Sequence, residues 1–214
     1  MLTSTGVTLA DLLERFGPIA AARMRYDPPP GTATEQDVLT LEAREKRLFE
    51  LADGVLVENT RGFDESLLAL RLAQFLLAFV ERHALGIVVG ADGMLRLAPG
   101  LVRIPDVSCV SWHRLPQRRV PRQAMPDLVP DLAVAVLSRG NTAREMACKL
   151  QEYFAAGVRL VVDPVREEIS VYTSPEQCDV LTASHTLQGG DVLPGFLLPG
   201  QQLFVEPTAG TEQP

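Results

Sequence analysis

Cysteine is scarce in this chain, and its spacing excludes the roles that clustered cysteines play. The three cysteines lie far apart and form no C-x-x-C pair: Cys109, Cys148 and Cys178. This spacing argues against zinc binding and against a disulfide framework. It fits a reducing compartment, so we expect a cytoplasmic location. Histidine is as scarce, and His83, His113 and His185 show no spacing typical of a catalytic triad or a zinc site.

Long hydrophobic runs are also absent. The most apolar stretch, residues 67–80, contains Arg71 and Gln74. It is shorter than the roughly 20 apolar residues that span a bilayer. The N-terminal sequence MLTSTGVTLADLLERF has neither a charged n-region nor a small-residue cleavage site. We therefore expect no membrane segment and no signal peptide.

Positive charge is in deficit, with a formal net charge of −7 at pH 7 and a pI of about 5.0. Proteins that bind nucleic acid tightly are usually basic, because phosphate contacts supply most of their affinity. The local exception is residues 113–122, HRLPQRRVPR, which predict a weak DNA contact through Arg114, Arg118, Arg119 and Arg122. The alternative, a solvated loop between two strands, stays open at this point.

The first 43 residues have the signals of short helices docked on a larger unit. Residues 8–16 predict a helix that Thr8 caps and Gly17 ends. Its apolar stripe consists of Leu9, Leu12, Leu13 and Phe16. After the break DPPPGTA at 27–33, Thr34 and Asp37 resemble a capping box that opens a helix toward Glu42. We expect residues 1–43 to form an N-terminal helical extension.

Residues 44–206 predict one α/β domain. Two apolar runs around the Asp53-Gly54 turn predict a hairpin over 48–57. A long helix is expected over 63–84, with Gly86 at its end and apolar positions that include Leu67, Leu70, Phe75 and Phe79. Strands follow over 87–89, 94–97, 102–110 and 132–137, then a helix over 142–156 and strands over 158–162 and 169–172. The segment after 172 predicts short edge elements, and the tail 207–214 predicts disorder.

Asp106 is the strongest candidate metal ligand. Side chains alternate along a strand, so one face of the expected strand 102–110 carries Val102, Ile104, Asp106 and Ser108. A carboxylate among apolar residues is costly to desolvate unless it meets a cation or hydrogen-bond donors. The plain alternative is an acid at a strand end that a loop solvates, and Pro105 makes this reasonable.

The next expected strand lacks an acid that metal-dependent phosphodiester cleavage needs. One face of this strand is small and partly polar, with Asp131, Ala133, Ala135 and Leu137. Two carboxylates on adjacent strands would hold Mg²⁺, which activates water and neutralises charge on the phosphate. Ala135 has a methyl group in that position and cannot bind a metal.

Lys149 lies on a helix that the sequence specifies well. Thr142 and Glu145 predict a capping box, and Gly157 predicts the helix end. The predicted buried stripe consists of Met146, Leu150, Tyr153 and Phe154. Lys149 borders this stripe, so its amine could reach a site and stabilise transition-state charge. Ordinary surface ion pairs with Glu145 and Glu152 are the alternative.

Three further acids are open to two interpretations. Glu50 and Asp53 flank the hairpin turn, and Glu65 opens the long helix. Each is either an additional acid of the site or a solvent-facing charge. The helix dipole also explains an acid in a first turn, which applies to Glu65.

With these motifs the chain resembles the Uma family, described as "putative restriction endonucleases", which has the PD-(D/E)XK fold. The resemblance covers roughly residues 8–205, and its motifs are FELADGVLVE, GMLRLAPGLVRIPDVSCVSWHRLP, PDLAVAVLSRGNTAREMACKLQEYFAAGVRL, VDP and GGDVLPGFLLPGQQLF. It implies a mixed sheet flanked by helices, with Mg²⁺ as cofactor and Mn²⁺ as the alternative ion. It implies catalytic roles for Asp106, Lys149 and Glu50, with Asp106 as metal ligand. The family sequence PDLxVEVLS places the catalytic glutamate on Ala135, the degenerate position.

These observations predict a Mg²⁺-dependent DNA endonuclease whose phosphodiester hydrolysis is impaired by Ala135. The alternative is a non-catalytic nuclease-fold protein that binds DNA or another protein. The sequence therefore leaves open whether the chain is an enzyme. Candidate partners are DNA and a second copy in a homodimer, and no membrane partner is expected.

Overall fold

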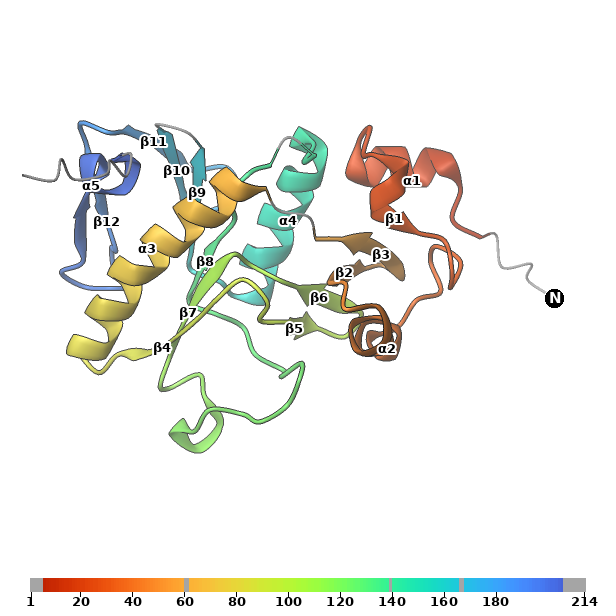
Figure 1. The fold of residues 1–214 in the computed structure, drawn as a ribbon, viewed down its shortest axis with the longest axis horizontal. Coiled ribbons are helices and arrows are strands. Elements are labelled where there is room, and N and C mark those ends of the chain that lie inside the picture. Colours follow the sequence, from red (N-terminus) through yellow and green to blue (C-terminus); the bar gives the residue numbers. More distant parts are fainter. Residues whose placement is uncertain (1–5, 60–61, 139, 166–167, 206–214) are drawn as a thin grey trace, which may run out of the picture.

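The computed structural model describes residues 6–59, 62–138, 140–165 and 168–205, and its framework is two sheets and two long helices (Figure 1). The first sheet has the antiparallel order β1-β3-β2-β6-β5, with bounds Met24–Arg25, Val55–Glu58, Phe49–Ala52, Leu101–Arg103 and Leu95–Ala98. The second has the order β11-β10-β9-β8-β7-β4, with bounds Cys178–Thr182, Glu168–Tyr172, Leu160–Val165, Leu132–Val134, Val107–Ser111 and Gly86–Val89. Strands β8 and β9 are parallel and the other neighbours antiparallel, so this sheet is mixed, as predicted.

Five α-helices occur in the described residues: α1 (Leu9–Phe16), α2 (Glu35–Glu45), α3 (Phe63–Arg82), α4 (Ala143–Ala156) and α5 (Gly200–Phe204). The capping boxes predicted at Thr34 and Thr142 are both present. Helix α4 ends at Gly157, whose φ of 98° is a left-handed conformation that glycine adopts without strain. A short two-stranded sheet, β12 (Thr186–Gln188) with β13 (Leu197–Pro199), is the third sheet of the described residues.

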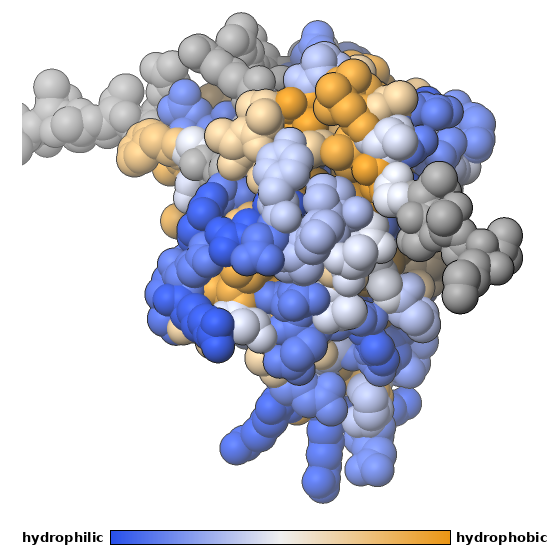
Figure 2. Space-filling view, turned by 90° about the vertical axis from the view of Figure 1, so that its right-hand side faces the viewer, coloured by the Kyte–Doolittle hydropathy of each residue, from blue (hydrophilic) through white to orange (hydrophobic). Residues whose placement is uncertain are grey.

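Helix α1 has the predicted bounds, and its apolar stripe is buried only in part. Leu12 and Phe16 are buried, whereas Leu9 and Leu13 are exposed. Figure 2 shows the end of the molecule to which α1 belongs. An apolar area lies at the top of this view, where Figure 1 places α1, and the surface below it is mostly hydrophilic.

Helix α3 is apolar on two faces and buries one of them. The residues of α3 that face the protein interior are Ala69, Leu72, Leu76 and Val80. Of the apolar positions named from the sequence, Phe75 and Phe79 pack against this core. Leu67 and Leu70 are exposed, because periodicity alone does not tell which apolar face meets the sheet. The helix ends at Arg82, the left-handed residue after it is Ala84, and Gly86 instead begins β4.

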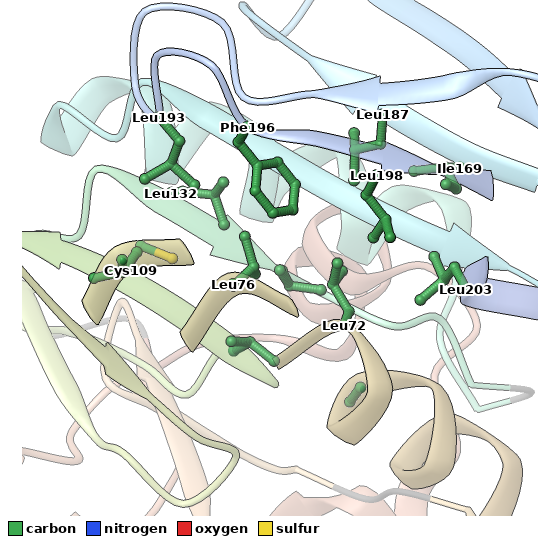
Figure 3. Packing of buried hydrophobic residues seen from close by; sticks show 14 of the residues in the cluster. Leu72, Leu76, Cys109, Leu132, Ile169, Leu187, Leu193, Phe196, Leu198 and Leu203 are labelled. Carbon is green, nitrogen blue, oxygen red and sulfur yellow. The ribbon is translucent and has the colours of Figure 1, made fainter. Parts of the chain in front are cut away.

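The larger apolar core lies between α3 and one face of the second sheet (Figure 3). Leu72 and Leu76 of α3 lie in it with Cys109 of β7 and Leu132 of β8. The C-terminal segment closes this core with Leu187, Leu193, Phe196, Leu198 and Leu203. We expected this segment to add only short edge elements, but its large apolar side chains are buried in the main core.

A second core lies on the opposite face of the same sheet. Val110 and Ala133 alternate away from α3 and share this core with Leu150 and Tyr153 of α4. Helices α3 and α4 therefore cover opposite faces of the second sheet. Helix α4 also forms the connection between the parallel strands β8 and β9.

The predicted strand 102–110 is two strands in the structure. Strand β6 ends at Arg103 in the first sheet, and β7 begins at Val107 in the second. Proline lacks a backbone N–H for a ladder, so Pro105 favours this break. The predicted strand 132–137 is shorter, since β8 ends at Val134, and β9 begins at Leu160 rather than at residue 158.

The first 43 residues contribute to the first sheet, because Met24 of β1 pairs with Val57 of β3. The division into an extension over 1–43 and a domain over 44–206 stays a prediction, and the tail 207–214 lies outside the described residues. Within the described ranges, no helix combines the length and apolar character that crossing a membrane requires.

Candidate active site

Asp106 lies where the chain passes from the first sheet to the second. Its backbone N–H donates to the carbonyl oxygen of Val134 at 2.9 Å, and its Oδ2 accepts from the N–H of Val136 at 2.7 Å. Asp106 therefore sits at a strand end, and the backbone after β8 fixes its carboxylate there. Ala135 is the residue between these two hydrogen-bonding positions.

One recess brings the predicted catalytic residues together. It is narrow, with room of about 20 Å³, and its wall includes Glu50, Asp106, Ala135 and Lys149. The remaining lining residues are Asn59, Ile104, Pro105, Val136, Asn141, Met146 and Tyr153. Side chains from β2, from the segments that follow β6 and β8, and from α4 thus converge on one space.

Lys149 reaches this recess from α4 and is 9% exposed. Its Nζ lies 2.8 Å from Oε2 of Glu50 and 3.4 Å from Oε1 of Glu145. The i, i−4 pair with Glu145 exists, but it lies inside the protein rather than on its surface. Glu152, the other surface partner that we considered, pairs with Arg103 instead.

Glu50 of β2 is an ionised carboxylate with donors on both oxygens. Its Oε2 also accepts from Arg103 at 2.9 Å, and its Oε1 accepts from the N–H of Ile104 at 3.2 Å. Burial alone would raise the pKa of Glu50. The charges of Lys149 and Arg103 outweigh burial and lower this pKa to about 2.

Arg103 is a site residue that the sequence reasoning missed. It is 2% exposed in β6, and its guanidinium bonds Glu50 of β2 and Glu152 of α4. Burial alone would lower the pKa of Arg103, but the two carboxylates raise it. The available signal was an arginine between Val102 and Ile104 in an apolar strand, which needs a buried acid for the same reason that Asp106 needs a partner.

Arg23 and Glu145 form a second buried pair beside Lys149. The guanidinium of Arg23 donates to both oxygens of Glu145 at 2.9 Å, and Asn141 adds a bond at 3.2 Å. Burial raises the pKa of Glu145, but the Arg23 bond and the Lys149 charge hold it below its usual range. No local signal predicts this pair, because its members lie 122 residues apart in sequence.

Tyr153 also lines the recess, one turn after Lys149 on α4. It is 2% exposed. Burial, followed by the charge of Glu50, raises the pKa of its hydroxyl well above the ordinary value, so Tyr153 is neutral. The sequence predicted that Tyr153 is part of the buried stripe of this helix, and it gave no sign that Tyr153 also lines the recess.

The other predicted acids and the histidines lie elsewhere. Asp53 is exposed in the hairpin turn and pairs with Arg15, and Glu65 is in the first turn of α3. The histidines contact separate partners: His83 with Phe79, His113 with Ser111, and His185 with Thr182. None of these five residues lines the recess.

The four arginines of the predicted DNA contact divide into two groups. Arg114 donates to Oδ1 of Asp131 at 2.8 Å and to the carbonyl oxygen of Gly157 at 2.6 Å. It therefore holds the loop against the end of α4. Exposed positions are occupied by Arg118, Arg119 and Arg122. Asp106 lies just before β7, and the loop begins just after β7. At roughly 3.3 Å per strand residue, the start of the loop is therefore about 15 Å from Asp106 along the strand.

A comparison with the models of known families identifies the family of the chain. The model of the Uma2 family, described as "putative restriction endonuclease", matches residues 35–201. The chain belongs to this family. No curated protein matches. Restriction-endonuclease-like families use divalent metal ions, so the family implies a metal at such a site.

A solved structure shows the same fold. It is titled as a putative nuclease belonging to DUF820 from Anabaena variabilis, and it superposes with a TM-score of 0.64 at 14% identity. The match covers 74% of this chain and 90% of that one. It confirms the predicted restriction-endonuclease-like α/β class.

The residues present in this Uma2 member do not fit a tightly held divalent ion. Hard cations prefer several oxygen ligands, and the carboxylates that line the recess are Glu50 and Asp106. Lys149 and Arg103 already neutralise Glu50. Across the described ranges, no group of three or more His, Cys, Asp or Glu side chains is arranged to hold a metal.

Proposed function

We propose that this chain is a DNA endonuclease of the Uma2 family whose Mg²⁺- or Mn²⁺-dependent phosphodiester hydrolysis is impaired. The observation that carries the proposal is the methyl group of Ala135 in the recess that Asp106, Glu50 and Lys149 share. A carboxylate at this position would be the third acid around one space. Without this carboxylate the recess has one metal ligand fewer, while Asp106, Glu50 and Lys149 keep their places.

The state of Lys149 supports the same proposal. Phosphodiester hydrolysis requires a positioned water and positive charge directed at the phosphoryl oxygens. The Lys149 ammonium is held between Glu50 and Glu145, so its charge is balanced by carboxylates. The backbone N–H of Val136 fixes Asp106 beside the space that a third acid would fill. The site thus has the framework for hydrolysis but a reduced set of groups to perform it.

A non-catalytic DNA-binding protein is the second candidate function. The exposed side chains of Arg118, Arg119 and Arg122 favour it, because phosphate contacts need accessible positive charge. These arginines lie in the loop after β7, at the end of that strand remote from Asp106. They can therefore bind DNA independently of the recess.

Nicking of supercoiled plasmid DNA in Mg²⁺ or Mn²⁺ tests the proposal. We expect little metal-dependent cleavage by the wild type and a clear gain in Ala135→Glu. Ala135→Gln is the matched control, because it adds almost the same volume without a charge, and it should gain nothing. Adding Asp106→Ala to Ala135→Glu should abolish the gain. Robust cleavage by the wild type that Asp106→Ala abolishes would overturn the proposal, whereas DNA binding without cleavage in every variant would favour the second candidate.

A further inference from the structure

The chain before α2 contacts helix α4, the helix that carries Lys149. The hydroxyl of Thr142, at the start of α4, donates to the carbonyl oxygen of Phe16. The guanidinium of Arg23 donates to the carbonyl oxygen of Gly140 at 2.7 Å, just before the helix. Both Phe16 and Arg23 precede the residues that the family model matches. Residues outside the family match therefore contact the helix of the candidate site.

Arg23 and Lys149 share one carboxylate, that of Glu145. Arg23 donates to Oε1 and to Oε2 of Glu145, each at 2.9 Å, whereas Nζ of Lys149 lies 3.4 Å from Oε1. The same Nζ lies 2.8 Å from Oε2 of Glu50. Glu145 is 2% exposed, so it needs a cation, and Arg23 supplies one through a bidentate pair. The Lys149 ammonium thus lies closer to Glu50, which lines the recess.

We propose that Arg23 is a positioning residue, which acts through Glu145 to direct the ammonium of Lys149 toward Glu50 and the recess. Without Arg23, Lys149 would be the nearest cation that the described residues place beside Glu145. A buried carboxylate that loses its cation is strongly destabilising, so the ammonium should move to Glu145, one turn before it on α4. Glu50 can release the ammonium more readily, because it keeps Arg103 at 2.9 Å.

The proposal separates two effects that different measurements detect. The direction of the Lys149 ammonium is a property of the folded chain and does not depend on hydrolysis. The consequence for catalysis rests on the proposed function, because Glu145 does not line the recess and an ammonium held by it would point away from a bound phosphate.

Crystal structures of the full chain test the direction of the ammonium. In Arg23→Met we expect Nζ of Lys149 within roughly 3 Å of Glu145 and beyond the roughly 4 Å of an ion pair from Glu50. Arg23→Gln is the second variant, because its amide can still donate a hydrogen bond without a charge and therefore disturbs the fold less. It should displace the ammonium in the same way. A Lys149 that keeps its Glu50 contact in these variants would overturn the proposal.

Arg25→Met is the matched control for the loss of an arginine from this part of the chain. Arg25 lies two residues after Arg23 and also donates to both oxygens of a glutamate, Glu45, at 3.1 and 2.8 Å. Neither Arg25 nor Glu45 lines the recess. Arg25→Met should therefore leave Lys149 beside Glu50. Displacement of Lys149 in this control would contradict a specific effect of Arg23.

A double variant tests whether Arg23 acts through Glu145. Arg23→Met with Glu145→Gln removes both charges of the buried pair, and glutamine keeps the capping box of α4. The ammonium of Lys149 should then return to Glu50. An ammonium that stays displaced would show that Arg23 acts by holding the chain in place rather than through the carboxylate, which would overturn the proposal.

Nicking of supercoiled plasmid DNA in the Ala135→Glu background tests the consequence for catalysis. Adding Arg23→Met should lower the rate at saturating Mg²⁺ by about tenfold or more, because positive charge is no longer directed at the phosphoryl oxygens. Further addition of Glu145→Gln should restore the rate, and Arg25→Met should not change it. A loss that Glu145→Gln does not restore would contradict the proposal. If the proposed function fails, Ala135→Glu itself does not nick DNA, and the crystal structures still decide the direction of Lys149.

Discussion

The ammonium of Lys149 lies 2.8 Å from the carboxylate of Glu50, and both groups are buried in the recess that Asp106 and Ala135 also line. Strand β2 supplies Glu50 and helix α4 supplies Lys149, so this ion pair joins the first sheet to the helix of the second. Glu50 thus has two cationic partners, Lys149 and Arg103, without any added metal ion.

Loss of Lys149 should be far more costly than loss of the chain's other lysine. Lys149→Met should lower the free energy of unfolding by about 2–4 kcal/mol, because removing one partner leaves a buried carboxylate less well paired. Lys46→Met is the control, since Lys46 also pairs with a glutamate four residues earlier, yet its side chain is 77% exposed. It should cost less than about 0.5 kcal/mol. Urea unfolding that gave equal losses would show that the Lys149 pair does not stabilise the fold.

The stability of the protein should depend on pH through Glu50. Folding lowers the pKa of Glu50 from 4.5 to about 2. The ionised form of Glu50 therefore contributes its full stabilisation of the fold at pH values above 4.5, the pKa in the unfolded chain. This stability, about 3 kcal/mol, is lost as pH falls through the folded value, and about 2 kcal/mol of it is gone by pH 3. Urea unfolding at pH 7 and pH 3 should therefore show a wild-type advantage over Glu50→Gln that shrinks at the lower pH. An advantage that is constant between the two would contradict the assigned pKa.

Position 135 should respond to charge in opposite ways with and without metal. In metal-free buffer Ala135→Glu should be less stable than the wild type by about 1 kcal/mol, because it adds a third carboxylate to a partly buried space. Mg²⁺ or Mn²⁺ should reverse this loss. Thermal melts of Ala135→Gln separate volume from charge, since this variant should not respond to the metal. A clear metal-free stabilisation by glutamate would mean that the surroundings of Ala135 are more positive than the structure indicates.

The two groups of arginines in the loop should separate in experiment. Combined replacement of Arg118, Arg119 and Arg122 by alanine should weaken DNA binding without changing thermal stability. It should also reduce the slope of log K against log salt by about 2–3, close to one unit for each lost phosphate contact. Arg114→Ala should instead lower stability, because Asp131 is 2% exposed and would lose a cation. If fluorescence-anisotropy titrations gave the triple variant the same DNA affinity as the wild type, the loop would not be part of the DNA-binding surface.

Elements with local signals could be predicted from the sequence, and so could part of the site. The capping box at Thr142 and the glycine at Gly157 define α4, and the Asp53-Gly54 turn defines the hairpin of β2 and β3. The order of the elements then brings Asp106 and Lys149 into one recess. Local chemistry and element order are therefore sufficient for this part of the structure.

The features that could not be predicted depend on contacts between distant segments. Arg23 meets Glu145 across 122 residues, and neither residue carries a sign of the other. The turn-rich C-terminal segment resembles an edge, yet Phe196 is buried in the main core. Periodicity finds both apolar faces of α3 but cannot tell which one packs on the sheet.

Manganese soaks of wild-type and Ala135→Glu crystals test the central claim most directly, because anomalous scattering locates the ion independently of activity. We predict no ordered Mn²⁺ within bonding distance of Asp106 in the wild type, and an ordered ion bound by Asp106 and the new carboxylate in Ala135→Glu. An ordered Mn²⁺ on Asp106 and Glu50 in the wild type would contradict the account, because it would show that Lys149 and Arg103 release Glu50 and that the site is complete without an acid at position 135.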